Sequence, residues 1–368
     1  MAKVDKKYHK LLETILKDGF KYEDPNRKGI NRIQIPSYQF KHDFKDGFPA
    51  ITTKKLYWEG VVGEFLWILR GSDNIKYLID NDINIWNKDA YNYYLKQGNE
   101  AGYKPNDTVM LSFTEWLQEI KEGEDLLGDI GRGYGAQLRN WKINNDYSVF
   151  GKMNMVTLDQ FAELINTLKT NPMATKKTVT FWNPAEKNQC ALTPCHWSFE
   201  ILVEPLSDKV ISDNALKLAI HTSKNKRRSA DITWAFTQTP KYQFTLKWHQ
   251  HSVDVFLGLN FNISSYALLA QIIGKMTNMI PKGIIGDLSN VHIYEPHVDA
   301  VKEQLSRDVN KYGKCELSID YDIEMGLKMP SLLEAFDKTL SQIEIKDFTL
   351  DGYNSYPTIP AEMLAYSK

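Results

Sequence analysis

The chain has 368 residues, with 45 Lys or Arg and 46 Asp or Glu, so its formal net charge is -1 at pH 7. This length permits one large domain or two smaller ones. The balanced charge gives no electrostatic reason to expect a polyanion, so no nucleic acid partner is expected. The three cysteines contain no CxxC pair, which argues against a disulfide framework and against a structural zinc site, and no metal is expected.

The N-terminal part of the chain predicts two helices. The opening segment is charged and amphipathic, and nowhere do about 18 apolar residues follow one another, so we expect a cytoplasmic protein with no membrane partner. Apolar residues at helical spacing from Tyr8 to Leu16 predict a first helix that ends at Gly19. After the polar loop DPNRKGINRIQ and a short extended segment, VVGEFLWILRG predicts a buried helix that ends at Gly71.

The second half of the chain alternates between helical and strand-like patterns. Residues 157–170 predict an amphipathic helix, which Asn171 and Pro172 end. The runs KTVTFW, HWSFEILVE, LKLAIH, ITWAF and QFTLKWHQ are strand-like. Helices are expected at SSYALLAQIIGKMTN and near 295–308. This order predicts an α+β fold, a mixed β-sheet covered by helices. We expect one domain over 1–368, with two surface insertions at about 96–128 and 206–241.

Cys195 is a candidate nucleophile. It lies in LTPCHW, beside a proline and a histidine at the entry of an alternating strand, where a thiol can be held rigidly at a surface. A lone cysteine is more often part of the packed interior, and Cys190 and Cys315 have no comparable setting. A reactive thiol needs a lowered pKa, which the adjacent His196 supplies only if the two side chains are in contact. The residues alone leave both interpretations of Cys195 open.

Two polar residues, Asp254 and Asn262, interrupt the apolar run VDVFLGLNFNISSYALL, and buried polar groups need partners. One interpretation is that they cap the turn around Gly258 and the helix after it. The other is ligand recognition. An Asn amide offers one donor and one acceptor, which match the O4 acceptor and the N3 donor of uracil, whereas an aspartate would suit cytosine.

Glu64 and Tyr134 are candidates for proton handling. Glu64 lies in GEFLWILRG, a helix that is apolar almost all round, where an unpaired carboxylate is expensive and its pKa is expected to rise. A salt-bridged structural glutamate is the alternative. Tyr134 lies in GRGYGAQLRNW, where glycines let the backbone approach a ligand closely, although an ordinary turn tyrosine fits the same pattern.

Eight blocks in order resemble the thymidylate synthase family, which also includes the pyrimidine nucleotide hydroxymethylases of bacteriophages. The similarity covers most of the chain outside the two insertions. The PCHW and DVFLGLNFNISSY segments are its most specific parts. The blocks are FPAITTKK, GEFLWILRG, NIWN, GYGAQLRNW, ALTPCHW, VDVFLGLNFNISSYALL, VHIYEPH and YPTIP.

The resemblance implies a reaction and a set of site residues. Cys195 would add to C6 of dUMP, so that C5 attacks the methylene group of the co-substrate 5,10-methylenetetrahydrofolate. The catalytic residues it implies are Cys195, Glu64, Tyr134 and His196. The residues it implies for nucleotide binding are Arg27, Lys176, Lys177, Gln250, His251, Ser252, Asn262, His292 and Tyr294. Those it implies for folate binding are Lys54, Trp86, Asp254, Gly258 and Phe261. It also implies a homodimer in which Lys176 and Lys177 serve the partner subunit's phosphate site.

Two departures from the family pattern affect phosphate binding. Lys176 and Lys177 stand where the family has an arginine pair, and lysine keeps the charge but loses the bidentate fork. His251 stands where the family has an arginine that touches both the phosphate and the nucleophilic sulfur. We expect a protonated His251 to replace that arginine in part. Arg227 and Arg228, in the basic loop SKNKRRSAD of the second insertion, are alternative phosphate ligands, although a solvated loop explains them more simply.

Two further departures concern the last step of the reaction. Asp89 stands where thymidylate synthases have a second tryptophan, and the chain continues past Met363 through LAYSK. Both lie where the intermediate is either shielded for hydride transfer or exposed to water. Together with Asn262, they favour a dUMP hydroxymethylase of the kind used by phages with modified DNA, acting in the host cytoplasm. Thymidylate synthase proper is the alternative. A catalytically weak relative that binds a nucleotide or RNA is a third hypothesis, from a different class.

Overall fold

A computed structural model describes residues 3–23, 30–104, 109–123, 125–145, 154–224, 232–320 and 331–364. Its centre is a seven-stranded sheet in the order β1-β2-β9-β7-β6-β5, with β8 paired to β9. The sheet is mixed, because β7 and β8 run parallel to β9 whereas the other neighbours are antiparallel. Its strands are β1 (Phe20–Glu23), β2 (Asn31–Asp43), β5 (Thr178–Thr180), β6 (His196–Pro205), β7 (Tyr242–Gln250), β8 (Val253–Asp254) and β9 (Ile280–Tyr294).

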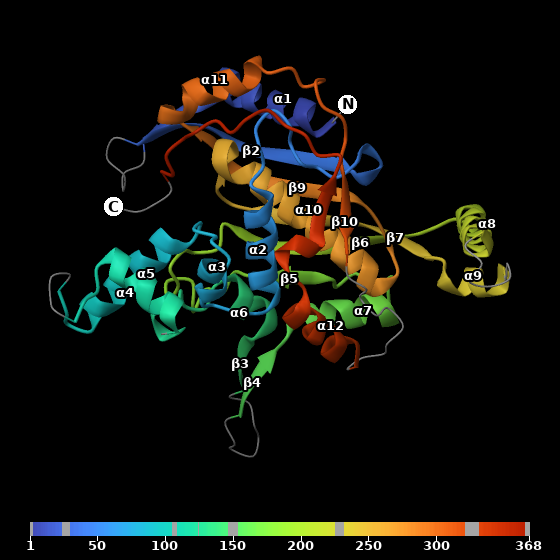
Figure 1. Ribbon diagram of the computed structural model, residues 1–368, viewed down its shortest axis with the longest axis horizontal. Helices are drawn as coiled ribbons and strands as arrows, with labels where there is room; N and C mark the ends of the chain where they lie inside the picture. The colour runs from blue at the N-terminus through green and yellow to red at the C-terminus, as the bar shows by residue number, and fades with distance from the viewer. Residues whose placement is uncertain are drawn as a thin grey trace.

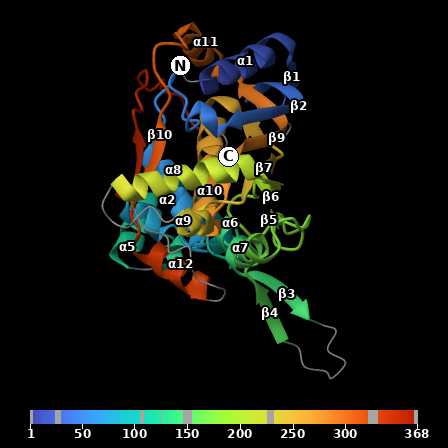
Figure 2. The ribbon, with the colours of Figure 1, turned by 90° about the vertical axis from the view of Figure 1, so that its right-hand side faces the viewer.

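Two small strand pairs lie outside this sheet (Figure 1), and most of the helices lie on one of its faces. The pair β3 (Trp141–Asn145) and β4 (Asn154–Leu158) extends away from the body (Figure 2), and β10 (Glu316–Ile319) pairs with β11 (Phe348–Asp351). The helices are α1 (Lys3–Asp18), α2 (Trp58–Leu69), α3 (Lys76–Asp80), α4 (Asn87–Glu100), α5 (Phe113–Glu122), α6 (Tyr134–Arg139), α7 (Gln160–Thr170), α8 (Asp208–Lys224), α9 (Ile232–Gln238), α10 (Asn260–Thr277), α11 (Val298–Ser306) and α12 (Ser331–Gln342).

The helix α10 is the centre of the apolar core. It packs against β7 and β9 and against α2 and α7, and 12 of its 18 residues are buried. Together with the preceding π-helical turn η3 (Val255–Leu259), it is long and apolar enough to cross a membrane. However, 67% of its most apolar window is buried inside the fold, which is the behaviour of a core helix. The α+β fold class expected from the sequence is confirmed.

The predicted helices in the body of the fold are present with small shifts at their ends. The helix α1 ends before Gly19, and α2 is followed by Gly71 in the left-handed region, at φ 72°. The helix α7 starts at Gln160 rather than at residue 157, because β4 continues to Leu158 and the Asp159 side chain caps the helix by accepting the backbone N–H of Ala162.

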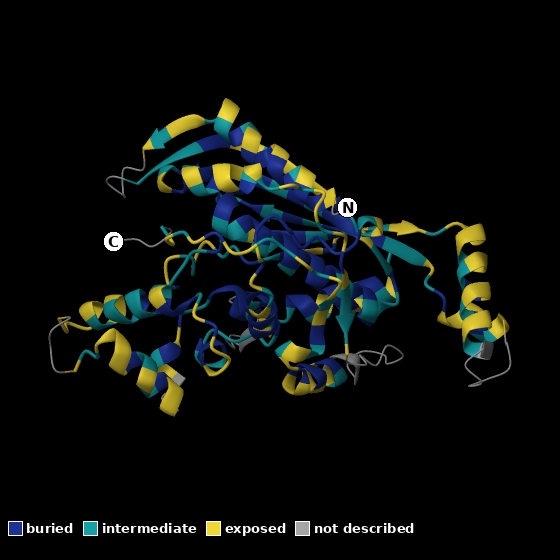
Figure 3. Ribbon diagram, turned by 45° about the horizontal axis from the view of Figure 1, so that its top comes forward, coloured by how far each residue is buried: buried dark blue, intermediate teal, exposed yellow. Residues whose placement is uncertain are grey.

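Two strand predictions in the second insertion are wrong. LKLAIH lies within α8, and ITWAF lies within α9. Short apolar runs do not distinguish a strand from a helix, and here Ala215 and Ala219, four residues apart, pack against Ala235 as a helical pair does. The two helices form an arm that projects from the body with mostly exposed residues (Figure 3).

A buried carboxylate ties α1 to the segment before α2. Asp5 is fully buried, and its two oxygens accept four hydrogen bonds, from the backbone N–H groups and the hydroxyls of Thr52 and Thr53, at 2.8–3.2 Å. Burial is the largest influence and raises the pKa of Asp5, while those four bonds lower it. The carboxylate therefore anchors the first helix to the FPAITTKK segment.

Candidate active site

A cavity of about 250 Å³ opens at the end of the sheet where β7, β8 and β9 meet α2, α6 and α10. Most of the residues that the sequence predicts for the site lie around it. The lining residues are Glu64, Ile85, Trp86, Asp89, Tyr134, Leu192, Cys195, His196, Gln250, Ser252, Asp254, Leu257, Gly258, Phe261, Asn262, His292, Tyr294 and Met363.

Cys195 is held at this cavity by backbone bonds to two other elements. It directly precedes β6, its backbone N–H donates to the Tyr134 hydroxyl at 2.8 Å, and its carbonyl accepts the N–H of His251 at 2.9 Å. Cys195 is half-buried, whereas Cys190 and Cys315 are buried and do not line the cavity. The fold thus presents one of the three thiols to a space of ligand size.

His196 and Tyr134 stack on one another beside the thiol. Their ring centroids are 4.3 Å apart, and His196 Nδ1 lies 2.9 Å from the Tyr266 hydroxyl. Desolvation lowers the pKa of His196 to about 3, so its imidazole is neutral at physiological pH. Burial raises the pKa of Tyr134 well above its usual value, so the phenol keeps its proton. A neutral His196 does not supply the cation that sequence reasoning associated with an activated thiol.

Glu64 points from α2 toward the cavity with one hydrogen-bond donor. The indole N–H of Trp86 donates to its Oε1 at 2.7 Å. Burial raises the pKa of Glu64 to about 7, and the Trp86 bond opposes this rise. Glu64 therefore changes its protonation state within the physiological range, as a residue that exchanges protons requires.

Asn262 is held in a defined orientation by Gln250. The Gln250 side chain donates from Nε2 to Asn262 Oδ1 at 3.1 Å and to the Ser252 carbonyl at 3.1 Å. Trp248 donates in turn to Gln250 Oε1 at 3.3 Å. With its oxygen identified by Gln250, the Asn262 amide can donate from Nδ2 to one ligand atom and accept at Oδ1 from a neighbouring one, which is the pattern that uracil needs.

Four of the five residues expected at the folate line the cavity. Asp254 accepts the N–H groups of Phe256 and Leu257 through Oδ1, at 3.0 and 3.2 Å. Trp86 and Phe261 provide aromatic walls, and Gly258 lies in the η3 turn. Lys54 does not line the cavity. It is buried, its ammonium donates to the Phe256 carbonyl and lies 4.0 Å from the centre of that ring, and burial lowers its pKa to about 8.

Within one chain, the residues expected to bind the phosphate do not gather at one place. Ser252 lines the cavity, but Lys176 is exposed away from it and Lys177 is buried with its ammonium donating to the Pro172 carbonyl. His251 packs edge-on against Trp182, with 5.4 Å between ring centroids, and desolvation lowers its pKa. This shift disfavours the protonated His251 expected from the sequence. Arg27 and the SKNKRRSAD loop, apart from its first two residues, lie outside the described residues.

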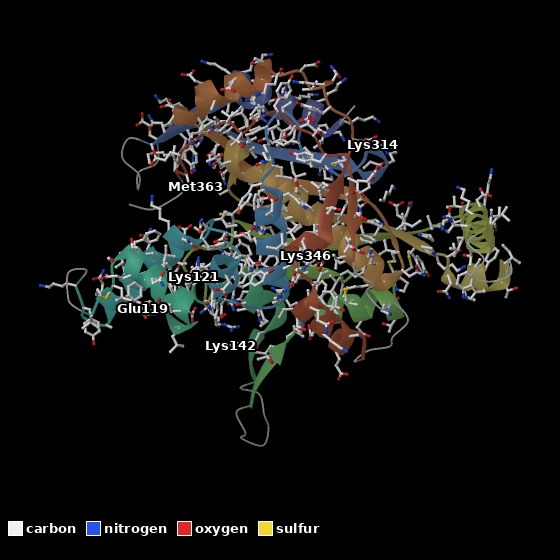
Figure 4. The ribbon with its side chains drawn as sticks, viewed as in Figure 1. Glu119, Lys121, Lys142, Lys314, Lys346 and Met363 are labelled. Atoms are coloured by element: carbon white, nitrogen blue, oxygen red, sulfur yellow. The ribbon has the colours of Figure 1, made fainter. Side chains whose placement is uncertain are left out.

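One wall of the cavity is formed by His292 and Tyr294 of β9, the residues expected at the sugar. His292 and Tyr294 lie two residues apart on this strand, so their side chains share one face, with ring centroids 4.9 Å apart. The structure adds apolar walls that sequence reasoning missed, Ile85, Leu192 and Leu257. Each of them has a signal in the sequence, because Ile85 is adjacent to Trp86, Leu257 is adjacent to Gly258, and Leu192 is three residues from Cys195. Met363, which Figure 4 labels in the C-terminal segment, also lines the cavity.

Comparison with known proteins finds similarity over nearly the whole chain. Residues 6–365 match the family model described as Thymidylate synthase. A thymidylate synthase of Mesoplasma florum is 31% identical, over 97% of this chain and 99% of the relative. Thymidylate synthases of Mycoplasma genitalium and Listeria monocytogenes are each 30% identical, over 96–97% of this chain and 98% of the relative.

Proposed function

The chain belongs to the thymidylate synthase family, and from this premise we propose that it converts dUMP to dTMP with 5,10-methylenetetrahydrofolate as the one-carbon donor. The observation that supports this most directly is that Cys195 and Asn262 line the same cavity, with Gln250 orienting the Asn262 amide. One side chain can bond the pyrimidine ring while the other recognises it. The relatives' names favour this reductive reaction over the hydroxymethylation that the sequence departures favoured.

In the proposed mechanism, Cys195 Sγ adds to C6 of the uracil ring, which makes C5 nucleophilic. Asn262 donates to O4 and accepts from N3–H, so negative charge that develops at O4 is stabilised. Once C5 has bonded the one-carbon unit, it loses its proton to a water molecule, and elimination later breaks the bond between sulfur and C6 and releases the Cys195 thiolate. The Tyr134 hydroxyl accepts the N–H of Cys195, so its own proton points elsewhere and can orient a water molecule at C5.

Glu64 and Asp254 would serve the other reactant. With a pKa of about 7, Glu64 can accept and return a proton as the amine of the folate leaves. Asp254 uses Oδ1 for backbone N–H groups, which leaves Oδ2 for the N–H groups of a pterin ring between Trp86 and Phe261. The cavity walls thus fit a flat, hydrogen-bonding heterocycle. When bound, the folate supplies the one-carbon unit and, in the reductive reaction, a hydride.

A second candidate is hydroxymethylation of dUMP, in which water captures the one-carbon intermediate. The specific observation in its favour is that the carboxylate-bearing Asp89 lines the cavity. A charged group at this wall draws water toward the site, whereas an indole would exclude it.

Product analysis separates the two reactions. The purified protein is incubated with dUMP and methylenetetrahydrofolate, absorbance is followed for dihydrofolate, and the nucleotide product is identified by mass spectrometry. We expect dihydrofolate and dTMP in equal amounts. Hydroxymethyl-dUMP without dihydrofolate would overturn the reductive proposal in favour of the second candidate.

The third hypothesis, a nucleotide- or RNA-binding relative without activity, is tested by a covalent adduct. We expect 5-fluoro-dUMP and the folate to add their combined mass to the protein, and the Cys195→Ser variant to show no such adduct. Nucleotide binding without any adduct in the unmodified protein would favour the binding hypothesis.

We also propose a homodimer of single-domain subunits over residues 1–368, acting in the cytoplasm. A homodimer accounts for the distance of Lys176 from the cavity of its own chain, because the side chain can then reach the partner subunit's phosphate site. Mixing Cys195→Ser subunits with Lys176→Ala/Lys177→Ala subunits should restore activity that neither variant has alone. Activity that stays absent after subunit exchange would count against a shared site.

A further inference from the structure

Asn290 occupies an unusual position in the middle of β9. Its φ is 49°, in the left-handed region that side chains other than glycine, asparagine and aspartate rarely adopt. The pairing of β9 with β7 ends at Leu288, and its pairing with β8 begins at Val291. Asn290 therefore lies in the gap between two parallel ladders, beside the turn that carries His251 and Ser252.

The side-chain amide of Asn290 fills this gap with two hydrogen bonds. Its Nδ2 donates to the His251 carbonyl at 2.7 Å, and its Oδ1 accepts from Gln34 Nε2 at 3.2 Å. Gln34 is 5% exposed and pairs directly with His292 across β2 and β9. A donor and an acceptor on one short side chain are what an asparagine provides and what neither aspartate nor glycine provides.

The same residue is connected to the nucleophile and to the sugar pocket. His251, whose carbonyl it holds, donates its own N–H to the Cys195 carbonyl at 2.9 Å. The Asn290 carbonyl lies 2.7 Å from His292 Nδ1, so it selects the tautomer with hydrogen on Nδ1 and leaves Nε2 as an acceptor. His292 is 1% exposed and lines the cavity.

We propose that Asn290 is a positioning residue that sets the distance between the Cys195 sulfur and the bound nucleotide. It fixes the 251–252 turn, and through it the backbone of Cys195, relative to the β9 residues beside the sugar. The inference rests on the proposed function, because it assumes that a nucleotide spans the cavity from Cys195 to His292. A displacement of about 1 Å in such a site lowers the rate by about 100-fold.

The test compares two asparagines in the left-handed region. Asn290→Gly keeps the backbone conformation and removes both side-chain bonds. Asn278→Gly is the matched control, because Asn278 has φ 52° at the end of α10 and does not line the cavity. We expect Asn290→Gly to lower kcat for dUMP by about 10- to 100-fold, and Asn278→Gly to change it less than about twofold. Equal kcat values in the two variants would overturn the proposal.

A second readout does not require turnover. Iodoacetamide labels Cys195, and the labelling rate is measured by mass spectrometry with and without dUMP. In Asn290→Gly, we expect a changed rate without nucleotide and an about tenfold higher dUMP concentration for half-protection, with Asn278→Gly like the unmodified protein. Should Asn290→Gly fail to fold, Asn290→Asp keeps the shape, loses the donor to His251 and is judged by the same criteria.

These results distinguish a failure of the proposed function from a failure of the proposed role of Asn290. If the unmodified protein forms no product from dUMP, the proposed function fails, while the nucleotide-free labelling rates still decide whether Asn290 positions Cys195. Product formation with identical labelling, protection and kcat in Asn290→Gly and Asn278→Gly would retain the function and remove the role of Asn290.

Discussion

Two carboxylates, the buried Asp5 and the half-buried Glu64, show how the same chemical group serves two purposes in this fold. Asp5, on α1, accepts hydrogen bonds from four donors and does not line the cavity of the candidate site. Among the described residues, Glu64, on α2, has one donor, the Trp86 indole, and it lines a cavity of about 250 Å³. Burial raises the pKa of both. The number of donors and the access to a ligand, rather than burial itself, separate an anchoring carboxylate from one that can exchange a proton.

The largest predicted effect concerns the cysteines, which show the same contrast. Cys195 lines the cavity, whereas Cys315 is buried and does not line it. Cys195→Ser should lower the rate of product formation by about four orders of magnitude or more, because an alkoxide is not available at neutral pH as a thiolate is. Cys315→Ser, at a buried thiol beside the Phe48 carbonyl, should keep kcat within about twofold. The measurement is steady-state kinetics on protein shown by circular dichroism to be folded. Comparable losses of kcat in both variants would contradict the distinction between a thiol at the cavity and a buried one.

Glu64→Gln should lower kcat by about 100- to 1,000-fold, because the amide keeps the size of the side chain and cannot exchange a proton. The unmodified protein should show an inflection of kcat near pH 7, the pKa of Glu64, and the variant should lack it. A pH profile of kcat for both proteins, from about pH 5 to 9, provides the measurement. An inflection that persists in Glu64→Gln would assign the titration to another group.

The two carboxylates should also differ in their effect on the stability of the protein. Asp5→Ala should lower the free energy of unfolding by about 3 kcal/mol, because Thr52 and Thr53 keep buried donors without acceptors. Its kcat per folded molecule should stay within about twofold. Urea unfolding and active-site titration measure the two quantities. An activity loss greater than the loss of folded protein would contradict an anchoring role for Asp5.

Replacing Glu64 should change the free energy of unfolding in the opposite direction. Its pKa is raised from 4.5 to about 7 in the folded protein, so ionisation opposes folding. The penalty is absent below about pH 4.5, grows as the pH rises to about 7 and then stays constant at about 3 kcal/mol. Glu64→Gln should therefore be more stable than the unmodified protein at pH 8, and the difference should vanish near pH 4.5. Thermal unfolding at the two pH values decides this, and a variant that is less stable at pH 8 would contradict it.

The sequence predicts the elements of the core better than those of the arm. The helix around Glu64, α7 and α10 follow from long apolar patterns with clear end signals, whereas LKLAIH and ITWAF are too short for their period to distinguish strand from helix. Burial in the arm is set by three alanines, which carry little signal in a hydrophobicity pattern.

The site required the resemblance to the family. Glu64, Cys195 and Asn262 are far apart in the sequence, so no spacing rule connects them, and the family blocks supplied the set that the fold gathers around one cavity. The raised pKa of Glu64 is expected from its apolar helix, but the charge states of His196 and His251 could not be predicted in this way. The neutral His196 and the lowered pKa of His251 arise from desolvation by side chains that only the folded chain brings near.

The arm of α8 and α9 begins and ends at neighbouring points of the sheet. Pro205 of β6 pairs with Tyr242 of β7, and the Leu206 N–H donates to the Lys241 carbonyl at 2.9 Å. A two-residue turn such as Asn-Gly can join these strand ends without changing their register. The base of the arm is therefore a suitable insertion site, at which a fluorescent protein or an affinity tag can replace the arm while the rest of the fold keeps its structure.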